Sequence, residues 1–264
     1  MSEIRVNNIT NRDGSTGTTV AGIPVVDSTS HFVVPTGRTG QRYVDGDENI
    51  VRDGLVLHLD AKYSYPSKTG ITATTDSLDP DVYTWYDMSG NESHGQLVNL
   101  VGYNASNGGS LVFDGVNDYV DSGSITTGGK ITVNAWVKIT TGARNQHIVD
   151  SSSNRWHLAI LGDDRPYFWN GSAYHTAAQV LSTSTWYMLT GVQSSTLDIY
   201  VNGVLSQSLS SNINVTTNNV NIGRWQSGSR PFSGNIAQVS IYNRALTASE
   251  VLQNYNALKG RFGL

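Results

Sequence analysis

Strict two-residue alternation of apolar and polar side chains is the feature of this sequence that most constrains its fold. It is clearest over residues 131–139, where every second side chain is apolar. The apolar positions are Ile131, Val133, Ala135, Val137 and Ile139, and between them stand Thr132, Asn134, Trp136 and Lys138. Because successive side chains of a strand point to opposite faces, this segment buries one face. Similar segments recur from Leu55 onward with turns at short spacing, which predicts an all-β, two-sheet antiparallel sandwich over about residues 54–264.

Two local signals support this fold. Asn202-Gly203 stands between two short apolar segments and is typical of a type I′ hairpin, whose two central residues both need a positive φ. Thr247 and Glu250 form a capping-box pattern that predicts a helix start. Its apolar face, predicted to pack on one edge of the sandwich, comprises Val251, Tyr255, Leu258 and Phe262.

The core is predicted from the inward positions of the alternating segments. These positions are Val133, Ala135, Val137, Leu197, Ile199, Val201, Ile222, Val239 and Ile241.

Residues 1–50 differ from the rest and are predicted to be an extended arm, with the sandwich domain covering 51–264. The arm holds only short apolar segments, at residues 4–9, 23–26 and 32–34, separated by Gly, Thr, Asp and Pro. Such segments cannot build a core of their own. We therefore expect the arm to dock on a larger assembly or to intertwine with sister chains in a homo-oligomer, with a trimer favoured.

Composition excludes several classes of protein. Only 14% of the residues are charged and the net charge is −4, so neither a coiled coil nor a nucleic-acid-binding surface is expected. The chain has no Cys, which removes disulfides and thiolate metal sites. The first residues lack the apolar segment of a signal peptide, and no apolar stretch is long enough for membrane insertion.

Five ordered motifs resemble the laminin G-like members of the concanavalin A-like lectin/glucanase superfamily. They lie at residues 54–61, 85–91, 111–120, 200–203 and 232–246. The resemblance implies a jelly-roll sandwich. Separately, residues 2–11 resemble the opening of structural proteins from marine, especially cyanobacterial, tailed phages. That resemblance implies a virion component assembled in the host cytoplasm, such as a capsid decoration or fibre subunit, held to capsid or tail proteins by the arm.

Enzymatic activity is not expected, although the superfamily includes glucanases. Glycoside hydrolysis normally uses two carboxyl groups that flank the scissile bond. The chain has only four Glu residues (Glu3, Glu48, Glu92 and Glu250), and no strand carries the Glu-x-Asp-x-Glu pattern of retaining relatives. The alternative is a free carbohydrate-active protein, either a soluble lectin or a glycan hydrolase.

The residues that could bind a metal are histidines for zinc and loop oxygens for calcium. The six His residues include no His-x-His or His-x₃-His pair, so no zinc site is expected. Calcium prefers oxygen ligands from loops. The calcium candidates are Asp87, Ser89, Asn91, Asp114 and Asp118. The alternative for these residues is an Asx turn, in which the carboxylate accepts from its own backbone.

Aromatic and planar polar side chains gather in two segments that are candidates for carbohydrate binding to a cell-surface glycan. The candidates are Arg165, Tyr167, Trp169, Asn170, Tyr174 and His175 in the first, and Arg224 and Trp225 in the second. Sugars stack their C–H faces on aromatic rings, while amides and guanidinium groups bind hydroxyls. The alternative is that these aromatic side chains lie at sheet edges or subunit contacts, where they also concentrate.

Overall fold

The computed structural model describes residues 49–62, 84–99, 101–152, 155–211, 214–215, 219–226 and 228–264, and the backbone of two short strands before them. Contacts divide the chain into two units, Met1–Asp47 and Glu48–Leu264. In the first unit, β1 (Thr18–Val20) pairs antiparallel with β2 (Ile23–Val25). The strand predicted at residues 23–26 is thus confirmed in β2, and those predicted at 4–9 and 32–34 lie outside the described residues.

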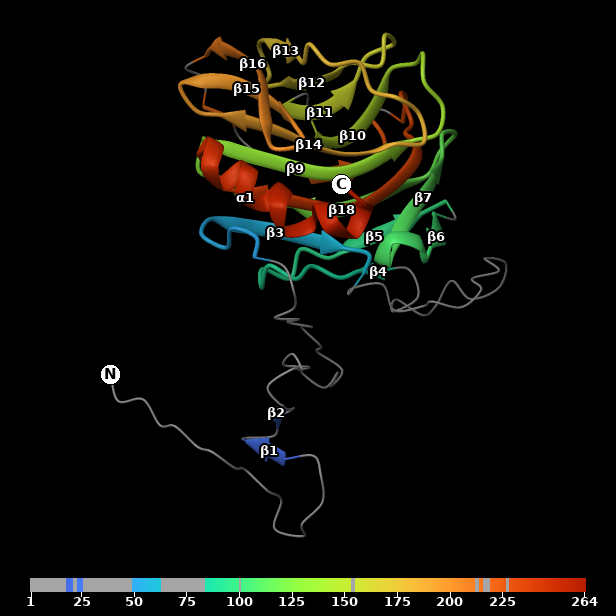
Figure 1. The fold of residues 1–264 in the computed structure, drawn as a ribbon, viewed down its shortest axis with the longest axis vertical. Helices are drawn as coiled ribbons and strands as arrows, with labels where there is room; N and C mark the ends of the chain where they lie inside the picture. The colour runs from blue at the N-terminus through green and yellow to red at the C-terminus, as the bar shows by residue number, and fades with distance from the viewer. Residues whose placement is uncertain are drawn as a thin grey trace. The chain divides into compact units, whose positions relative to one another are not determined.

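The second unit is an antiparallel sandwich of two sheets, as predicted (Figure 1). Sheet 1 has the order β16-β15-β14-β9-β18-β7-β6, with β3 also paired to β18. Its strands are β3 (Leu55–Asp60), β6 (Gly102–Asn104), β7 (Ser110–Asp114), β9 (Ile131–Ile139), β14 (Trp186–Gln193), β15 (Thr196–Val201), β16 (Val204–Ser210) and β18 (Ser233–Tyr242).

Sheet 2 has the order β13-β12-β11-β10-β17-β8-β5-β4. Its strands are β4 (Thr84–Trp85), β5 (Gly95–Val98), β8 (Tyr119–Ser124), β10 (Gln146–Ser151), β11 (Trp156–Ile160), β12 (Pro166–Trp169), β13 (Tyr174–Thr176) and β17 (Asn219–Ile222). A 3₁₀ turn, η1 (Ser106–Gly108), precedes β7.

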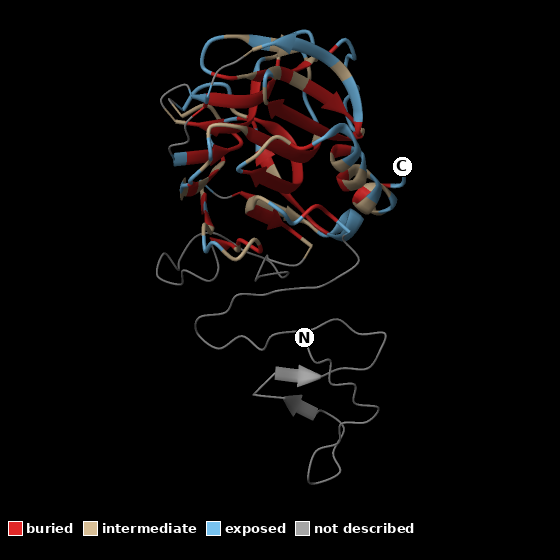
Figure 2. Cartoon of the chain, turned by 90° about the vertical axis from the view of Figure 1, so that its left-hand side faces the viewer, coloured by how far each residue is buried: buried red, intermediate tan, exposed pale blue. Residues whose placement is uncertain are grey.

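The main core lies between the two sheets, where the strands are buried (Figure 2). All nine predicted core positions belong to it, so the alternation identified the inward faces correctly. At one point the sheets approach so closely that only glycine fits. A Cβ on Gly191 in β14 would lie 2.3 Å from the Phe168 ring on β12.

The hairpin between β15 and β16 is also confirmed. Asn202 and Gly203 both have positive φ, at 51° and 79°, as a type I′ turn requires.

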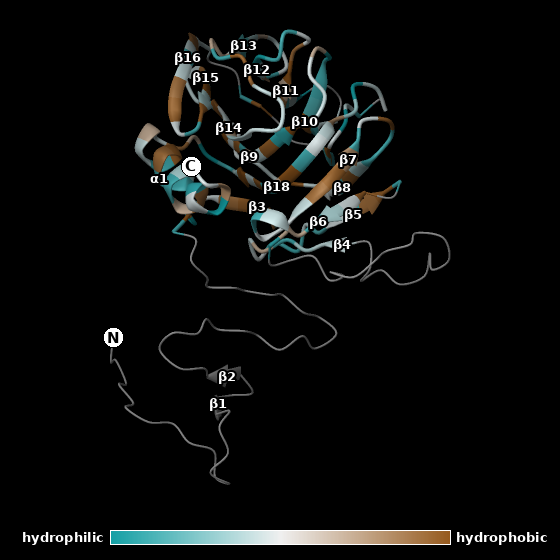
Figure 3. Cartoon of the chain, turned by 45° about the vertical axis from the view of Figure 1, so that its right-hand side comes forward, coloured by the Kyte–Doolittle hydropathy of each residue, from teal (hydrophilic) through white to brown (hydrophobic). Residues whose placement is uncertain are grey.

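The C-terminal helix α1 (Ala248–Leu258) begins with the predicted capping box, in which the Thr247 side chain accepts from Glu250 N–H and the Glu250 carboxylate accepts from Thr247 N–H. A 3₁₀ turn, η2 (Lys259–Phe262), follows. Brown and teal residues alternate around α1, as expected of a helix with one apolar face (Figure 3). None of the helices in the described residues is both long enough and apolar enough to cross a membrane.

The prediction that this helix packs on an edge of the sandwich is wrong. It covers the outward face of sheet 1 over its central strands β9 and β18. The reason is Trp136, which points outward from β9 and would expose a large apolar ring. Phe262 and Tyr255 instead stack on Trp136, with ring centroids 4.3 Å and 5.8 Å away.

The residues at the predicted boundary are tied to the sandwich. Ile50 and Val51 are both buried in the small core under the helix. Val51 N–H donates to Asn254 Oδ1, and the Val51 carbonyl accepts from the Tyr242 hydroxyl. A truncation that spares the sandwich must therefore end before Ile50.

Candidate functional site

A row of side chains crosses the outward face of sheet 2, the sheet that the helix does not cover. Direct cross-strand pairing links Tyr174 to Trp169, Trp169 to His157, and His157 to Asp150. Directly paired residues of an antiparallel sheet project to the same face. The row continues through Asn221 on β17 to Asp121 on β8. Aromatic, imidazole, amide and carboxylate groups thus lie side by side.

A β-bulge places two of the site residues. Positions 147 and 150 are three residues apart and would point to opposite faces of a regular strand. The register of β10 against β11 shifts between His147 and Val149, which adds one residue to β10. Ile148 and Val149 therefore both enter the core, and His147 and Asp150 share the outward face.

Four rings follow one another on this face, in the order Trp169, His157, His147 and Trp225; the two outer pairs are stacked and the central pair of imidazoles is tilted. The successive centroid separations are 6.0, 4.4 and 5.8 Å, with interplanar angles of 16°, 43° and 26°. Tyr167 meets His157 edge-on and Tyr174 meets Tyr167 edge-on. We call this set of six residues (Tyr167, Trp169, Tyr174, His147, His157 and Trp225) the aromatic face.

The connection between β17 and β18 covers part of the aromatic face. Gln226 N–H donates to Asp150 Oδ2 at 3.2 Å, and the Arg230 guanidinium lies over the Trp225 ring at 4.6 Å. As a result His147 and Asp150 are fully buried. Tyr174 remains 58% exposed and Trp169 and Trp225 are half-buried, so the edges of the aromatic face reach solvent.

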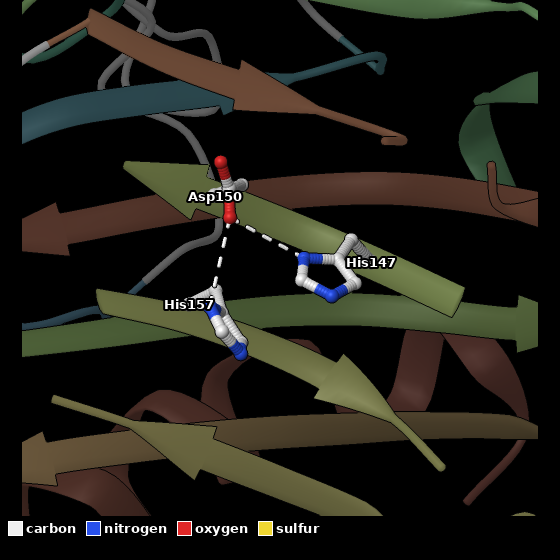
Figure 4. Close-up of side chains that lie close together, drawn as sticks. All are labelled: His147, Asp150 and His157. Carbon is white, nitrogen blue, oxygen red and sulfur yellow. Dashed lines mark hydrogen bonds and ion pairs between the residues drawn. The ribbon is translucent and has the colours of Figure 1, made fainter. Parts of the chain in front are cut away.

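Three buried polar groups lie close together beneath this connection. In Figure 4, the Asp150 carboxylate faces both His147 and His157, and dashed lines join it to each. Burial lowers the pKa of His147 to about 3 and that of His157 to about 2, and raises the pKa of Asp150 to about 7. Both imidazoles are therefore neutral at pH 7, and each keeps one nitrogen with a lone pair.

The predicted carbohydrate-binding residues separate into two groups. The structure brings Tyr167, Trp169, Tyr174 and Trp225 together on the aromatic face. Arg224, beside Trp225, stacks its guanidinium 3.1 Å above the Tyr119 ring.

Three other predicted residues take structural roles. Arg165 pairs with Asp163 at 2.6 Å in the turn before β12. Asn170 is buried, donates to Gln193 and Ser211 and accepts from the backbone of its own turn. His175 pairs with the core residue Phe168 and so projects to the inner face. These three do not contribute to the aromatic face.

The spacing of metal ligands within a single element does not predict the cluster of His147, Asp150 and His157. They come from two strands and depend on the bulge. The only signal available was the pair Ile148-Val149, two consecutive apolar residues that interrupt the alternation of a strand.

The calcium candidates lie in two turns. Asp87 Oδ1 accepts from His58 N–H and Ser89 N–H, and Oδ2 accepts from the Ser89 hydroxyl and Ser93 N–H, which is the Asx-turn alternative. Asn91 donates to the Ser89 hydroxyl.

In the β7–β8 turn, Asp114 Oδ1 accepts from Val116 N–H, and Asp118 Oδ2 accepts from Asp114 N–H. Asp118 Oδ1 is buried without a hydrogen-bond partner. Calcium binding stays a prediction.

Comparison with known proteins identifies the family. The laminin G-like model of the concanavalin A-like lectin/glucanases superfamily matches residues 113–252, more than half of the chain. The chain belongs to this superfamily. No curated protein sequence matches it.

Solved structures with the superfamily's fold are similar to this chain. Domain 4 of an extracellular arabinanase from Geobacillus stearothermophilus, in complex with arabinotriose, has a TM-score of 0.58 at 17% identity, covering 76% of this chain and 98% of that domain. A Trypanosoma rangeli sialidase mutant displaying trans-sialidase activity has a TM-score of 0.57 at 15% identity, covering 80% of this chain and 34% of the sialidase.

The receptor binding domain of botulinum neurotoxin C/D mosaic serotype has a TM-score of 0.55 at 15% identity, covering 78% of this chain and 52% of that one. The chain thus spans a third to a half of the last two proteins. Identities this low show a shared fold alone.

Proposed function

We propose that this protein is a non-enzymatic, glycan-binding β-sandwich displayed on a virion, as a capsid decoration or fibre subunit. The observation that carries the glycan-binding part is the aromatic face, where Trp169, Tyr174 and Trp225 reach solvent around a core of stacked imidazoles. A sugar ring placed on the edge of Trp225 would find the Arg230 guanidinium close by, because that group lies over the same indole. This combination of rigid aromatic rings and planar donors suits hydroxyl-rich ligands.

The superfamily membership supports the same proposal. The arabinanase domain with the same fold was solved with arabinotriose, and the neurotoxin domain is a receptor binding domain. Display on a virion rests on the sequence of residues 2–11 and on the short apolar segments of the arm. The arm would dock on capsid or tail proteins, or join sister chains in a trimer, and leave the sandwich facing outward.

Two measurements test the two parts of the proposal separately. A glycan array probed with the full chain should give a restricted set of bound glycans, and Trp169→Ala should lose them. The variant lacking residues 2–47 should remain a folded sandwich that binds the same glycans but no longer joins particles or oligomerises. Normal assembly of the truncated chain would exclude the arm as the anchor.

A glycan hydrolase is the second candidate, favoured by one specific observation. Asp121 and Asp150 project from the same face of sheet 2 with one strand between them. Two strand spacings separate their backbones by about 9.6 Å, at the limit of the range of about 6.5–9.5 Å that separates the two carboxyl groups of inverting enzymes. Burial raises the pKa of Asp150 to about 7, which suits a general acid, although Gln226 would have to leave the buried carboxylate before a glycosidic oxygen could reach it. Release of reducing sugar from laminarin-type polysaccharides that is abolished by Asp121→Asn would establish this second function instead.

A further inference from the structure

Three metal-ligating side chains meet beneath the connection between β17 and β18. His147 and Asp150 project from β10, and His157 projects from β11 as the direct cross-strand partner of Asp150 (Figure 4). One ligand atom of each lies within 4.8 Å of the other two, and all three side chains are buried. Among the residues that the structure describes, no other three His, Asp or Glu side chains come this close.

The separations inside this cluster are long for hydrogen bonds. Asp150 Oδ1 lies 3.3 Å from His147 Nδ1 and 3.6 Å from His157 Nδ1. Charge-assisted N–H···O bonds are usually about 2.7–2.9 Å. In a tetrahedral zinc site with bonds of about 2.0–2.1 Å, neighbouring ligand atoms are about 3.3 Å apart. An octahedral ion with the same bond lengths brings them to about 2.9 Å. The two observed separations match a tetrahedron better than an octahedron of the same bond length. The longer bonds of a calcium ion would also fit these separations, but calcium prefers oxygen ligands and two of the three ligands here are imidazoles.

A second observation points independently to a ligand. His157 Nδ1 is buried, faces the Asp150 carboxylate and has no hydrogen-bond partner. A buried polar atom left without a partner costs free energy, and such atoms are rare in folded proteins. A cation held between His157 Nδ1, Asp150 Oδ1 and His147 Nδ1 would satisfy it.

The surroundings of His147 suit this role. If His147 Nδ1 ligates the metal, Nε2 carries the proton and can donate to the Tyr167 hydroxyl, which lies 3.5 Å away. Such a partner fixes the orientation of a ligating imidazole. Arg230 Nη1 lies at the same distance from Nε2, but a guanidinium only donates. Metal binding would therefore break the Arg230 contact, and the positive charge of Arg230 opposes the metal.

We propose that His147, Asp150 and His157 form a tetrahedral site for a zinc-type divalent cation, with water as the fourth ligand. This goes beyond the proposed glycan binding, because the metal ties β10 to β11 below the sugar-facing rings. Trp225 stacks on the ligand His147 and Trp169 stacks on the ligand His157, so the ion would hold both indole rings in place.

The test uses the full chain, first treated with chelator and dialysed. Equilibrium dialysis against Zn²⁺ should give one equivalent bound, and Co²⁺ should produce the intense visible absorption of a four-coordinate ion. His157→Gln should weaken Zn²⁺ binding by more than about 100-fold, and Tyr167→Phe by about 10-fold. His175→Gln, on the inner face of the same sheet, is the matched control and should bind as the unaltered chain does.

Arg230→Gln provides a test with the opposite sign, because it removes the positive charge that opposes the metal. Arg230 is exposed, so its loss should not disturb folding. This variant should bind Zn²⁺ more tightly. The proposal would be overturned by less than one equivalent of Zn²⁺ on the unaltered chain or by the weak spectrum of octahedral Co²⁺. Equal binding by His157→Gln and His175→Gln would also overturn it. None of these readouts involves a glycan, so failure here leaves the glycan-binding proposal standing.

Discussion

Trp225 stacks on His147 with a ring-centroid separation of 5.8 Å and an interplanar angle of 26°. The two residues come from different elements: His147 lies on β10, and Trp225 lies in the connection between β17 and β18. Their contact fixes that connection against the outward face of sheet 2. The Arg230 guanidinium lies over the same indole. The presentation of Trp225 to solvent therefore depends on the buried imidazole beneath it.

The close approach of the two sheets at Gly191 predicts a stability effect. A methyl group added at this position would lie 2.3–2.8 Å from three atoms of the Phe168 ring. Gly191→Ala should therefore destabilise the sandwich by about 1–3 kcal/mol or more, measured by urea unfolding. Gly260→Ala is the control, because nothing lies within 4 Å of the added carbon. Equal stability of the two variants would contradict the close packing of Phe168 on β14.

The capping box predicts how stability responds to acid. The Arg244 guanidinium beside Glu250 lowers the pKa of that carboxyl to about 2. A carboxyl with a lowered folded pKa stabilises the fold above its unfolded pKa of about 4.3. That contribution is lost as the pH falls from about 4.3 towards 2.

Glu250→Gln should be less stable than the unaltered chain at pH 7, by on the order of 1 kcal/mol. The difference should shrink as the pH approaches 2. Melting temperatures measured between pH 7 and pH 2 check this, with Glu92→Gln, a turn residue, as the charge-matched control. A difference that stays constant with pH would exclude Glu250 as the source.

The buried carboxyl of Asp118 predicts a pH dependence of stability opposite in sign to that of Glu250. Burial raises the pKa of this carboxyl to about 6, because desolvation disfavours its charged form. Its contribution to stability is complete below its unfolded pKa of about 3.9 and is lost as the pH rises through about 6. Asp118→Asn removes this loss, so the variant should gain stability relative to the unaltered chain between pH 4 and pH 7.

The unaltered chain and Asp118→Asn also test calcium binding. If the turn of Asp114 and Asp118 binds the ion, millimolar calcium should raise the melting temperature of the unaltered chain but not of Asp118→Asn, and EDTA should reverse the effect. Unchanged melting of both in calcium and EDTA would exclude a calcium site there.

The pH prediction has its own contrary outcome. If Asp118→Asn loses stability relative to the unaltered chain between pH 4 and pH 7, the pKa of Asp118 is not raised in the folded state.

The sandwich could be predicted from the sequence because its signals are local. Alternation marks inward residues such as Val133 and Ile241, the Asn-Gly dipeptide marks the hairpin at Asn202-Gly203, and the capping-box pattern marks the helix start at Thr247. These patterns depend on a few neighbouring residues and are therefore visible in the chain itself.

The site could be predicted only in part, because it depends on pairing between distant segments. Register sends His175 to the inner face although its neighbour Tyr174 is on the aromatic face. A single bulge brings His147 to the side of Asp150. The position of the helix was missed for a similar reason, since only the folded sheet places Trp136 where a cover is needed.

The central claim is that the rings of the aromatic face bind a glycan. The most direct measurement is calorimetric titration of the best glycan from an array into the unaltered chain, Trp225→Ala and Val204→Ala. Val204 is an exposed residue of β16 in sheet 1 and serves as the control. Loss of a stacked ring should weaken binding at least about tenfold, which corresponds to about 1.4 kcal/mol. We predict that loss for Trp225→Ala with no change for Val204→Ala; equal affinities for all three proteins, with all three folded, would contradict the account.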